Sequence, residues 1–209
     1  SYPAHITDRL LQTIKEEKKI CKYLDLPLQH ISDSVLKRMG RAAGREETVK
    51  LLEKIRFYLP NVTLRSTFIV GFPGESKEDF SELLDFIKNA RFDRAGFFAY
   101  SREPGTQAAG MPRQIGEREK MKRLKQAQEL QKEIMAFKQA AHVGENLTVL
   151  VDGPSPDYEG LWEGRTAGDA PEIDGVVYFK PREGCRPGDF VNIRIAHSQE
   201  FALMGEINT

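Results

Sequence analysis

The sequence has little cysteine and no long hydrophobic run. Only two cysteines occur in 209 residues, Cys21 and Cys185, and they stand far apart. A disulfide framework is therefore not expected, and a reducing cytoplasm is the expected location. No apolar stretch approaches the roughly 20 residues that a membrane-spanning helix needs. Neither sign of charge prevails, because 31 basic residues balance 31 acidic ones.

The balanced total hides an asymmetry between the two ends of the chain. Residues 144–209 contain 12 acidic and 5 basic residues, a net charge of −7, so the rest of the chain carries +7. An acidic domain repels the phosphates of nucleic acid and attracts a basic protein. A basic protein partner is one interpretation, and an ordinary solvated face is the other.

One stretch, Val62 to Phe80, combines a strand, a turn and a helix start. It reads VTLRSTFIVGFPGESKEDF, and its first half is β-branched and aromatic at strand length. Two glycines and a proline in Gly71–Gly74 predict a tight turn. Ser76 stands three residues before Asp79, the spacing of a helix N-cap. In parallel α/β folds ligands bind at the carboxyl ends of strands, so the turn lies where a ligand is expected.

Strand-like and helix-like segments alternate through residues 1–142, which is typical of an α/β fold. The pattern predicts three strands, over residues 21–28, 62–70 and 93–100, too few for a closed barrel. The segment therefore reads as the second half of an α/β barrel. A long linking helix is predicted over residues 117–141. Its apolar stripe is expected to pack on the barrel, and it consists of Met121, Leu124, Ala127, Leu130, Ile134 and Phe137.

From Val143 onward the hydrophobic period changes from that of a helix to two. About five short strands separated by glycine-rich turns occupy residues 143–209. This pattern predicts a small closed β-barrel.

Three long strings resemble consecutive barrel motifs of the radical S-adenosylmethionine methylthiotransferases. They are YLDLPLQHISDSVLKRMGR from Tyr23, TLRSTFIVGFPGESKEDF from Thr63 and FAYSREPGTQAA from Phe98. Residues 143–209 resemble the TRAM domain that ends these enzymes. The resemblance implies the second half of a TIM-like radical-SAM barrel over residues 1–142, followed by an OB-like TRAM barrel over residues 143–209.

Two branches of that family differ at the first motif. The tRNA-modifying branch usually has Leu-Pro-Val-Gln-Ser-Gly-Ser, whereas this chain has LPLQHIS from Leu26, which resembles the ribosomal-protein branch. The segment DAPEIDG from Asp169 also resembles that branch. The resemblance implies transfer of a methylthio group to the β-carbon of an aspartate in ribosomal protein S-12, with the acidic TRAM domain binding that basic protein. A tRNA adenosine methylthiotransferase is the alternative within the class, and a non-catalytic TRAM binding module for protein or RNA is the alternative outside it.

The cofactors implied are S-adenosyl-L-methionine (SAM) and two four-iron four-sulfur clusters. An unactivated carbon has no acidic proton, so a radical is needed, and the cofactors supply it. Each cluster needs three cysteines, which Cys21 and Cys185 cannot provide. We therefore expect no metal ligand here, clusters bound by a preceding segment, and a chain that is an inactive fragment when alone. Cys21 is expected to pack and Cys185 to be incidental.

The resemblance also implies roles at the strand ends. Arg65 is expected to bind the SAM carboxylate if its side chain points into the barrel; an outward ion pair is the other interpretation. Ile69 and Gly71 resemble the adenine side of the site, although turn geometry alone explains a glycine. Gln29 either hydrogen-bonds SAM or has a structural role.

Three further residues follow the same edge of the predicted sheet. Tyr100 and Ser101 end the last strand, and Tyr100 is equally consistent with a core position. His30 is interpreted as a substrate-positioning residue or as a histidine satisfied within the fold, since radical abstraction requires no acid–base group.

Overall fold

The computed structural model describes residues 3–199 and 201–208, and the chain divides into two compact units. The first is Ser1–Ile134 and the second is Met135–Thr209. No helix among the described residues has both the length and the hydropathy needed to cross a bilayer.

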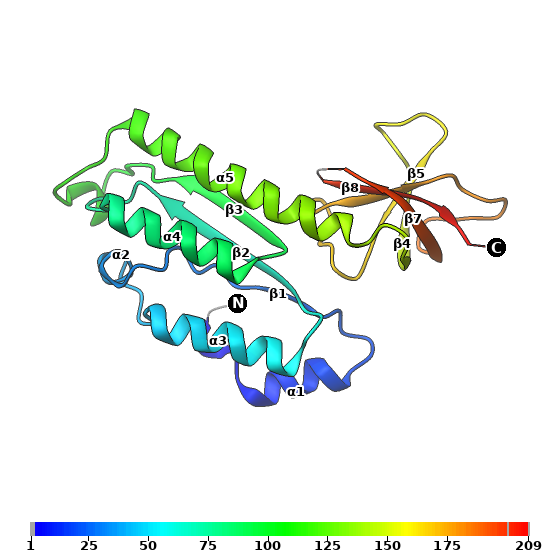
Figure 1. Cartoon of the computed structure of the whole chain (residues 1–209), viewed down its shortest axis with the longest axis horizontal. Helices are drawn as coiled ribbons and strands as arrows, with labels where there is room; N and C mark the ends of the chain where they lie inside the picture. The colour runs from blue at the N-terminus through cyan, green and yellow to red at the C-terminus, as the bar shows by residue number, and fades with distance from the viewer. Residues whose placement is uncertain (1–2, 200, 209) are drawn as a thin grey trace. The chain divides into compact units, whose positions relative to one another are not determined.

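The first unit is an α/β structure built on a three-stranded parallel sheet in the order β1-β2-β3 (Figure 1). Its strands are β1 (Tyr23–Asp25), β2 (Thr63–Val70) and β3 (Arg94–Ala99). The helices are η1 (Pro3–His5), α1 (Asp8–Glu16), α2 (Asp33–Arg38), α3 (Arg45–Tyr58), α4 (Lys77–Ala90), η2 (Ala108–Gly110) and α5, which begins at Glu117 and ends at Ala140. The three strands and their parallel order agree with the predicted partial barrel.

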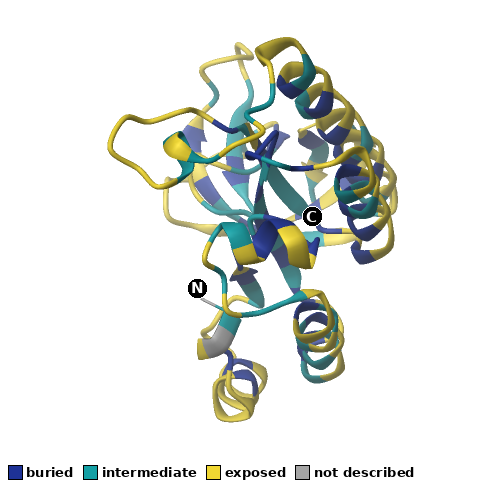
Figure 2. Ribbon diagram, turned by 90° about the vertical axis from the view of Figure 1, so that its left-hand side faces the viewer, coloured by how far each residue is buried: buried dark blue, intermediate teal, exposed yellow. Residues whose placement is uncertain are grey.

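Strand β2 alternates strictly between buried and half-buried residues. Its buried residues, Leu64, Ser66, Phe68 and Val70, face the core formed with the helices. Phe68 is fully buried, with its ring 5.6 Å from those of both Phe92 and Phe97. Figure 2 shows the helices with buried residues toward the sheet and exposed residues outward. The other face of the sheet, which we call the open face, is half-exposed along β2.

The first strand is shorter than the sequence predicts. Strand β1 covers three residues, and the next pairing to β2 is an isolated bridge between Gln29 and Phe68. Asp25 is opposite Arg65, so unbroken register would place Gln29 opposite Ile69. One extra residue therefore stands on the first chain, around Pro27, which has no amide hydrogen for the ladder. Cys21 precedes the strand and is exposed, so the expectation that it packs is wrong.

Helix α5 packs on the core along the middle of its predicted apolar stripe but not at the two ends of the stripe. Ala127 and Ile134 are buried, and Leu124 and Leu130 pack against the core. Met121 is 54% exposed, so the stripe does not pack along its whole length. Phe137, in the part of the helix beyond the first unit, is 66% exposed. The first turns instead bury the long side chains of Lys120 and Arg123.

The second unit is a closed five-stranded barrel in the order β4-β5-β6-β8-β7, with β7 pairing back to β4. Its strands are β4 (Asn146–Pro154), β5 (Trp162–Arg165), β6 (Val176–Phe179), β7 (Phe190–Ser198) and β8 (Ala202–Ile207). The inward residues alternate along the strands, and they include Val149, Val151, Val177, Phe179, Val191, Ile193, Ile195 and Leu203. The predicted small β-barrel is confirmed.

Candidate functional site

The strands of the first unit end in three loops, at Gln29, Gly71 and Tyr100, which we call the carboxyl rim. Gly71 and Gly74 adopt positive φ values of 74° and 79°, which glycine reaches without steric cost. The Glu75 carboxylate accepts hydrogen bonds from the backbone N–H groups of Gly71 and Phe72, the latter at 3.0 Å. One side chain thus satisfies two amides that leave the β2 ladder.

Glu75 is paired with a buried cation from helix α5. Arg123 Nη1 lies 3.0 Å from Glu75 Oε1, and both side chains are almost completely buried. Burial raises the pKa of the Glu75 carboxyl, and the Arg123 guanidinium and the two backbone amides oppose that rise. Removing either partner would leave the other as an unpaired buried group, which is costly.

A second buried cation from helix α5 reaches the ends of β2 and β3. Lys120 Nζ donates to the Tyr100 carbonyl at 2.9 Å and forms an ion pair with Glu117 at 2.6 Å. A Cβ atom added at Gly71 would lie 2.5 Å from Lys120 Cγ. Glycine is therefore required at position 71 by both its φ value and the lysine stem against it.

Asp79, in the first turn of α4, connects that helix to the loop after β1. Its carboxylate accepts from Ser32 Oγ, from Ser34 Oγ at 2.7 Å and from the Ser76 amide at 2.8 Å. Burial by itself would raise the pKa of Asp79, but these hydrogen bonds outweigh it and hold the pKa far below its ordinary value. The Ser76 hydroxyl accepts from the Asp79 amide at 3.0 Å, so the predicted capping box is confirmed.

His30 is completely buried in the loop after β1. Its Nδ1 accepts from the Ser32 amide at 3.0 Å, which places the proton of the neutral ring on Nε2. Nε2 has no partner among the described residues. Burial lowers the pKa of His30 to about 4, with Asp79 opposing and Arg38 and Arg123 reinforcing that shift. His30 is therefore neutral at pH 7, in a position that is not solvent-accessible.

Arg65 lies on the open face of the sheet. Its side chain is 20% exposed, and its Nε stands 3.8 Å from Asp25 Oδ2 of the neighbouring strand. Ile69 follows on the same face of β2, opposite Phe98, which is 60% exposed. The open face thus carries a guanidinium toward the amino end of β2 and an apolar patch toward its carboxyl end, near the rim.

Gln29 and the two residues at the end of β3 occupy other parts of the rim. Gln29 has a positive φ of 72°, and its amide and carbonyl bond Thr67 and Ile69 at 2.8 Å each. The Tyr100 ring is buried against Phe72, and its hydroxyl has no partner among the described residues. Ser101 is exposed, and its hydroxyl donates to Glu103 at 2.7 Å. Backbone pairing therefore fixes Gln29, and Tyr100 has a core position in which its buried hydroxyl has no partner among the described residues.

Three residues of the rim are missed by sequence reasoning: Glu75, Lys120 and Arg123. A signal for the two cations exists in the sequence, because positions 120, 123, 127 and 134 follow helical spacing toward the buried Ala127 and Ile134. Charged residues at core positions of an amphipathic helix indicate buried pairing. The carboxylate that pairs with Arg123 lies 48 positions away and is not evident from the sequence.

The groups of the rim and the open face are complementary to SAM, and the described residues do not fit an iron–sulfur cluster. SAM has a carboxylate, polar ribose and amine groups, and an adenine ring. The open face has the guanidinium of Arg65 and the half-buried Ile69, and the rim has Tyr100, whose hydroxyl has no partner among the described residues. No group of three or more histidines, cysteines or carboxylates among the described residues is arranged to hold a metal. The two cysteines of the sequence are too few for a cluster.

The net negative charge of the β-barrel comes from residues 143–179, which we call the acidic half, and residues 180–209 form the neutral half. Residues 143–179 contain eight acidic residues and one basic residue, Arg165, whereas residues 180–209 contain four of each. Within the acidic half, Tyr178 donates to Asp157 at 3.0 Å, and its ring lies 4.9 Å from that of Tyr158. Burial and the carboxylate of Asp157 raise the pKa of Tyr178 to about 12. Carboxylates and aromatic rings together suit lysine or arginine side chains.

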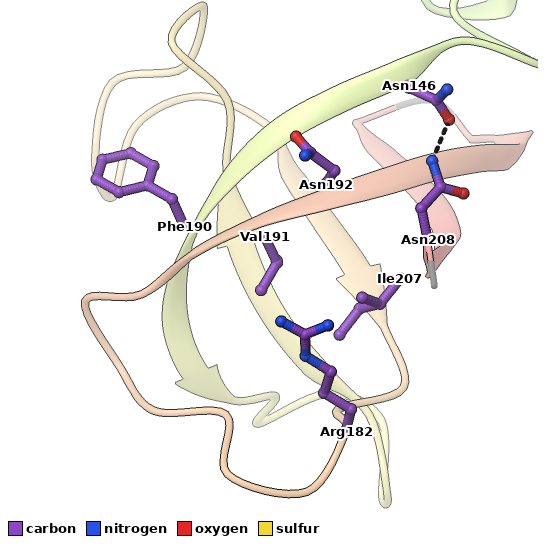
Figure 3. A pocket seen from close by; sticks show the side chains of 7 residues that line it. All are labelled: Asn146, Arg182, Phe190, Val191, Asn192, Ile207 and Asn208. Carbon is purple, nitrogen blue, oxygen red and sulfur yellow. Dashed lines mark hydrogen bonds between the residues drawn. The ribbon is translucent and has the colours of Figure 1, made fainter.

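The second unit contains a polar cavity of about 390 Å³, lined mostly by residues of the neutral half (Figure 3). Its lining residues are Asn146, Arg182, Phe190, Val191, Asn192, Ile207 and Asn208. The side-chain amide of Asn208 donates to Asn146 at 2.6 Å, which orients both amides in the cavity lining. No carboxylate lines this cavity, in contrast to the acidic half.

Comparison with known proteins gives two family matches and many close relatives. Residues 2–87 match the Radical SAM superfamily and residues 143–207 match the TRAM domain. Ribosomal protein uS12 methylthiotransferases from Pelotomaculum thermopropionicum and Geobacter sulfurreducens are 50% and 46% identical over 99% of this chain. In each case the match covers 46% of the relative, so the chain spans about half the length of the curated relatives it matches.

Solved structures give a weaker match. Coproporphyrinogen III oxidase from Escherichia coli, a radical SAM enzyme, is 21% identical with a TM-score of 0.46, covering 68% of this chain and 31% of that one. The relationship is carried by the sequence matches along nearly the whole chain. This chain contains a Radical SAM superfamily segment followed by a TRAM domain, and along nearly its whole length it is similar to the ribosomal protein uS12 methylthiotransferases.

Proposed function

We propose that this chain is part of an enzyme that adds a methylthio group to the β-carbon of an aspartate in ribosomal protein S12. The observation that carries the proposal is its identity of 43–50% to uS12 methylthiotransferases over 99% of its length. Such chemistry uses SAM and iron–sulfur clusters, and these cofactors supply the radical. A ribosomal substrate places the reaction in the cytoplasm.

We assign SAM binding to the carboxyl rim and the adjoining open face. In this proposal Arg65 binds the SAM carboxylate, Ile69 and Gly71 line the adenine side, and the end of β3 at Tyr100 and Ser101 borders the ligand. Gln29 hydrogen-bonds SAM from the loop after β1, and His30, which is completely buried, positions the substrate through that loop. The support is that Arg65 and Ile69 share one face of β2, with Tyr100, whose buried hydroxyl has no partner among the described residues, at the end of the next strand.

The two clusters are assigned to protein outside this chain, because its two cysteines cannot bind them. We therefore propose that the chain alone does not catalyse the reaction. The domain boundary is proposed near residue 142, between the linking helix and the TRAM domain, and the TRAM match beginning at residue 143 supports that position.

The acidic half of the TRAM domain is proposed as the surface that binds S12. Eight carboxylates against one arginine in residues 143–179 give a strongly negative field, which steers a basic protein and repels RNA phosphates.

The rim assignment is tested by SAM affinity. A fusion of this chain to the part of a uS12 methylthiotransferase that it does not match is reconstituted with iron and sulfide, and SAM binding is measured by equilibrium dialysis. Arg65→Met removes a charge-assisted contact, so the dissociation constant should rise roughly tenfold to a hundredfold. Lys88→Met, an exposed change on α4, is the control. Equal affinity in the Arg65 variant would remove Arg65 from the site.

A further inference from the structure

Helix α5 lies outside both family matches, which cover residues 2–87 and 143–207. Nothing in those matches gives its first turns a role. Yet the two cations of this region, Lys120 and Arg123, are only 3% and 5% exposed, whereas neighbours on the same helix such as Met121 and Lys122 are exposed. Burying two cations is costly unless each is fully paired, so their contacts identify what they hold.

Arg123 holds the loop that follows β2. Its Nη1 donates to Glu75 Oε1 at 3.0 Å, to the Glu75 carbonyl at 3.1 Å and to the Ser76 carbonyl at 3.4 Å. Its Nε donates to Glu119 at 3.0 Å, and the guanidinium lies 5.5 Å from the centre of the Phe80 ring. All of these contacts fix the guanidinium at the junction between the glycine turn and helix α4.

The Arg123 contact is transmitted to the backbone of the turn. The second oxygen of the same carboxylate, Glu75 Oε2, accepts from the amides of Gly71 and Phe72. A carboxylate that bridges a guanidinium and two amides orients those amides only while it stays ionised and in place. Arg123 therefore acts on Gly71 through Glu75 rather than by direct contact.

Lys120 holds the neighbouring strand end. Its ammonium donates to the Tyr100 carbonyl at 2.9 Å and lies 5.3 Å from the centre of the Tyr100 ring. Its methylene stem occupies the space that a Cβ atom at Gly71 would take. One helix turn thus contacts the ends of both β2 and β3, which are the two strand ends proposed to border SAM.

We propose that Arg123 and Lys120 are positioning residues for SAM: they hold the Gly71–Glu75 turn and the end of β3 in the conformation that receives the cofactor. The inference rests on the proposed function for the location of SAM, and it adds a part of the chain to which no role was assigned. Neither residue needs to touch the cofactor, because each acts through the backbone that it fixes.

We call the contacts of Arg123 and Lys120 with the Gly71–Glu75 turn and the end of β3 the clamp. Amide hydrogen exchange on this chain tests the clamp without any cofactor. In Arg123→Met the carboxylate of Glu75 loses its cation, so exchange at Gly71 and Phe72 should accelerate roughly tenfold or more. Arg118→Met is the matched control, since Arg118 is exposed on the same helix, and it should leave exchange unchanged. Lys120→Met should accelerate exchange at Gly71 with a smaller effect on Phe72.

A rescue variant separates positioning from general loss of structure. In the double variant Glu75→Gln with Arg123→Met, a neutral amide replaces the unpaired buried carboxylate and its oxygen still accepts from the turn. Part of the protection at Gly71 and Phe72 should return. Acceleration spread over the whole sheet, or no recovery in the double variant, would overturn the clamp.

SAM affinity of the same variants in the reconstituted fusion tests the functional half of the inference. Affinity should fall roughly tenfold in Arg123→Met, recover in part in the double variant, and stay unchanged in Arg118→Met. Faster exchange with unchanged affinity would reduce the clamp to a structural feature and overturn the positioning role. A wild-type fusion that binds no SAM would overturn the proposed function itself, and the exchange result would still decide whether the clamp exists.

Discussion

The carboxyl rim is set, residue by residue, by buried polar groups whose partners come from distant parts of the chain. Glu75 is paired with Arg123, Asp79 with Ser32 and Ser34, and Lys120 with the Tyr100 carbonyl. Each group would be costly to bury alone. These paired groups fix the loops of the rim relative to one another, which favours a preorganised binding site.

His30 gives the first unit a defined dependence on pH. Its folded pKa of about 4 lies below the ordinary value of 6.5, so the unfolded chain takes up a proton first as the pH falls. The stabilisation is complete above pH 6.5 and is lost as the pH falls toward 4. Between pH 7 and 4.5 the free energy of unfolding should drop by about 2–3 kcal/mol through this residue. Urea titrations of wild type and His30→Gln measure it, and equal pH slopes in the two proteins would contradict the account.

Alanine substitutions at Gly71 and Gly40 distinguish the cost of backbone strain from the cost of steric crowding. Both have positive φ values, 74° and 68°, but a Cβ atom at Gly71 meets Lys120 whereas one at Gly40 meets nothing within 4 Å. Gly40→Ala should cost about 1 kcal/mol from strain. Gly71→Ala should cost about 3 kcal/mol, because overpacking adds to strain. Equal losses in chemical denaturation would show that Lys120 does not hold the turn.

Among the elements, the sequence is most informative where local chemistry decides the structure. The alternation in Thr63–Val70, the Ser76–Asp79 capping box and the period-two pattern after Val143 all predict elements that the structure contains. Their signals lie within a few residues of one another.

The features that the sequence does not give depend on contacts between distant residues. Strand β1 is shorter than predicted, and its register with β2 shifts by one residue before Gln29. Both features depend on pairing with β2, whose residues lie about 40 positions later in the sequence. In the first turns of α5, Lys120 and Arg123 are buried and Met121 is exposed, because the two cations pair with the Tyr100 carbonyl and with Glu75. Which candidate residues touch SAM stays a prediction.

The β-barrel has its own critical glycine. A Cβ atom at Gly205 in β8 would lie 2.3 Å from the Arg194 carbonyl of β7, so the two strands cannot keep their spacing with any other residue. Gly205→Ala should destabilise the second unit by about 3 kcal/mol. Trp162 is the only tryptophan in the chain and lies in β5, so its fluorescence reports this unit alone.

Gly184→Ala is the matched control for that measurement. Gly184 has a φ of 81° but no atom within 4 Å of an added Cβ, so only strain of about 1 kcal/mol is expected. If the unfolding midpoint falls no further in Gly205→Ala than in Gly184→Ala, β7 and β8 can move apart to accommodate the added methyl group, and the prediction is wrong.

For the whole molecule, we propose cofactor binding by the first unit and partner binding by the second. Asp157→Asn with Glu163→Gln neutralises two carboxylates of the acidic half. Affinity of the chain for ribosomal protein S12 should fall roughly threefold to tenfold, and the difference should shrink with salt. Glu183→Gln with Glu206→Gln removes the same charge from the neutral half and should have little effect. Equal losses from both pairs would reduce the acidic half to a solvated surface.

The most direct test offers both candidate substrates to one enzyme. The reconstituted fusion is given S12 and tRNA in the same reaction with SAM, and mass spectrometry measures the methylthio group on each. We expect the methylthio group on an aspartate of S12 and none on tRNA. Methylthio-adenosine in tRNA beside unmodified S12 would contradict it.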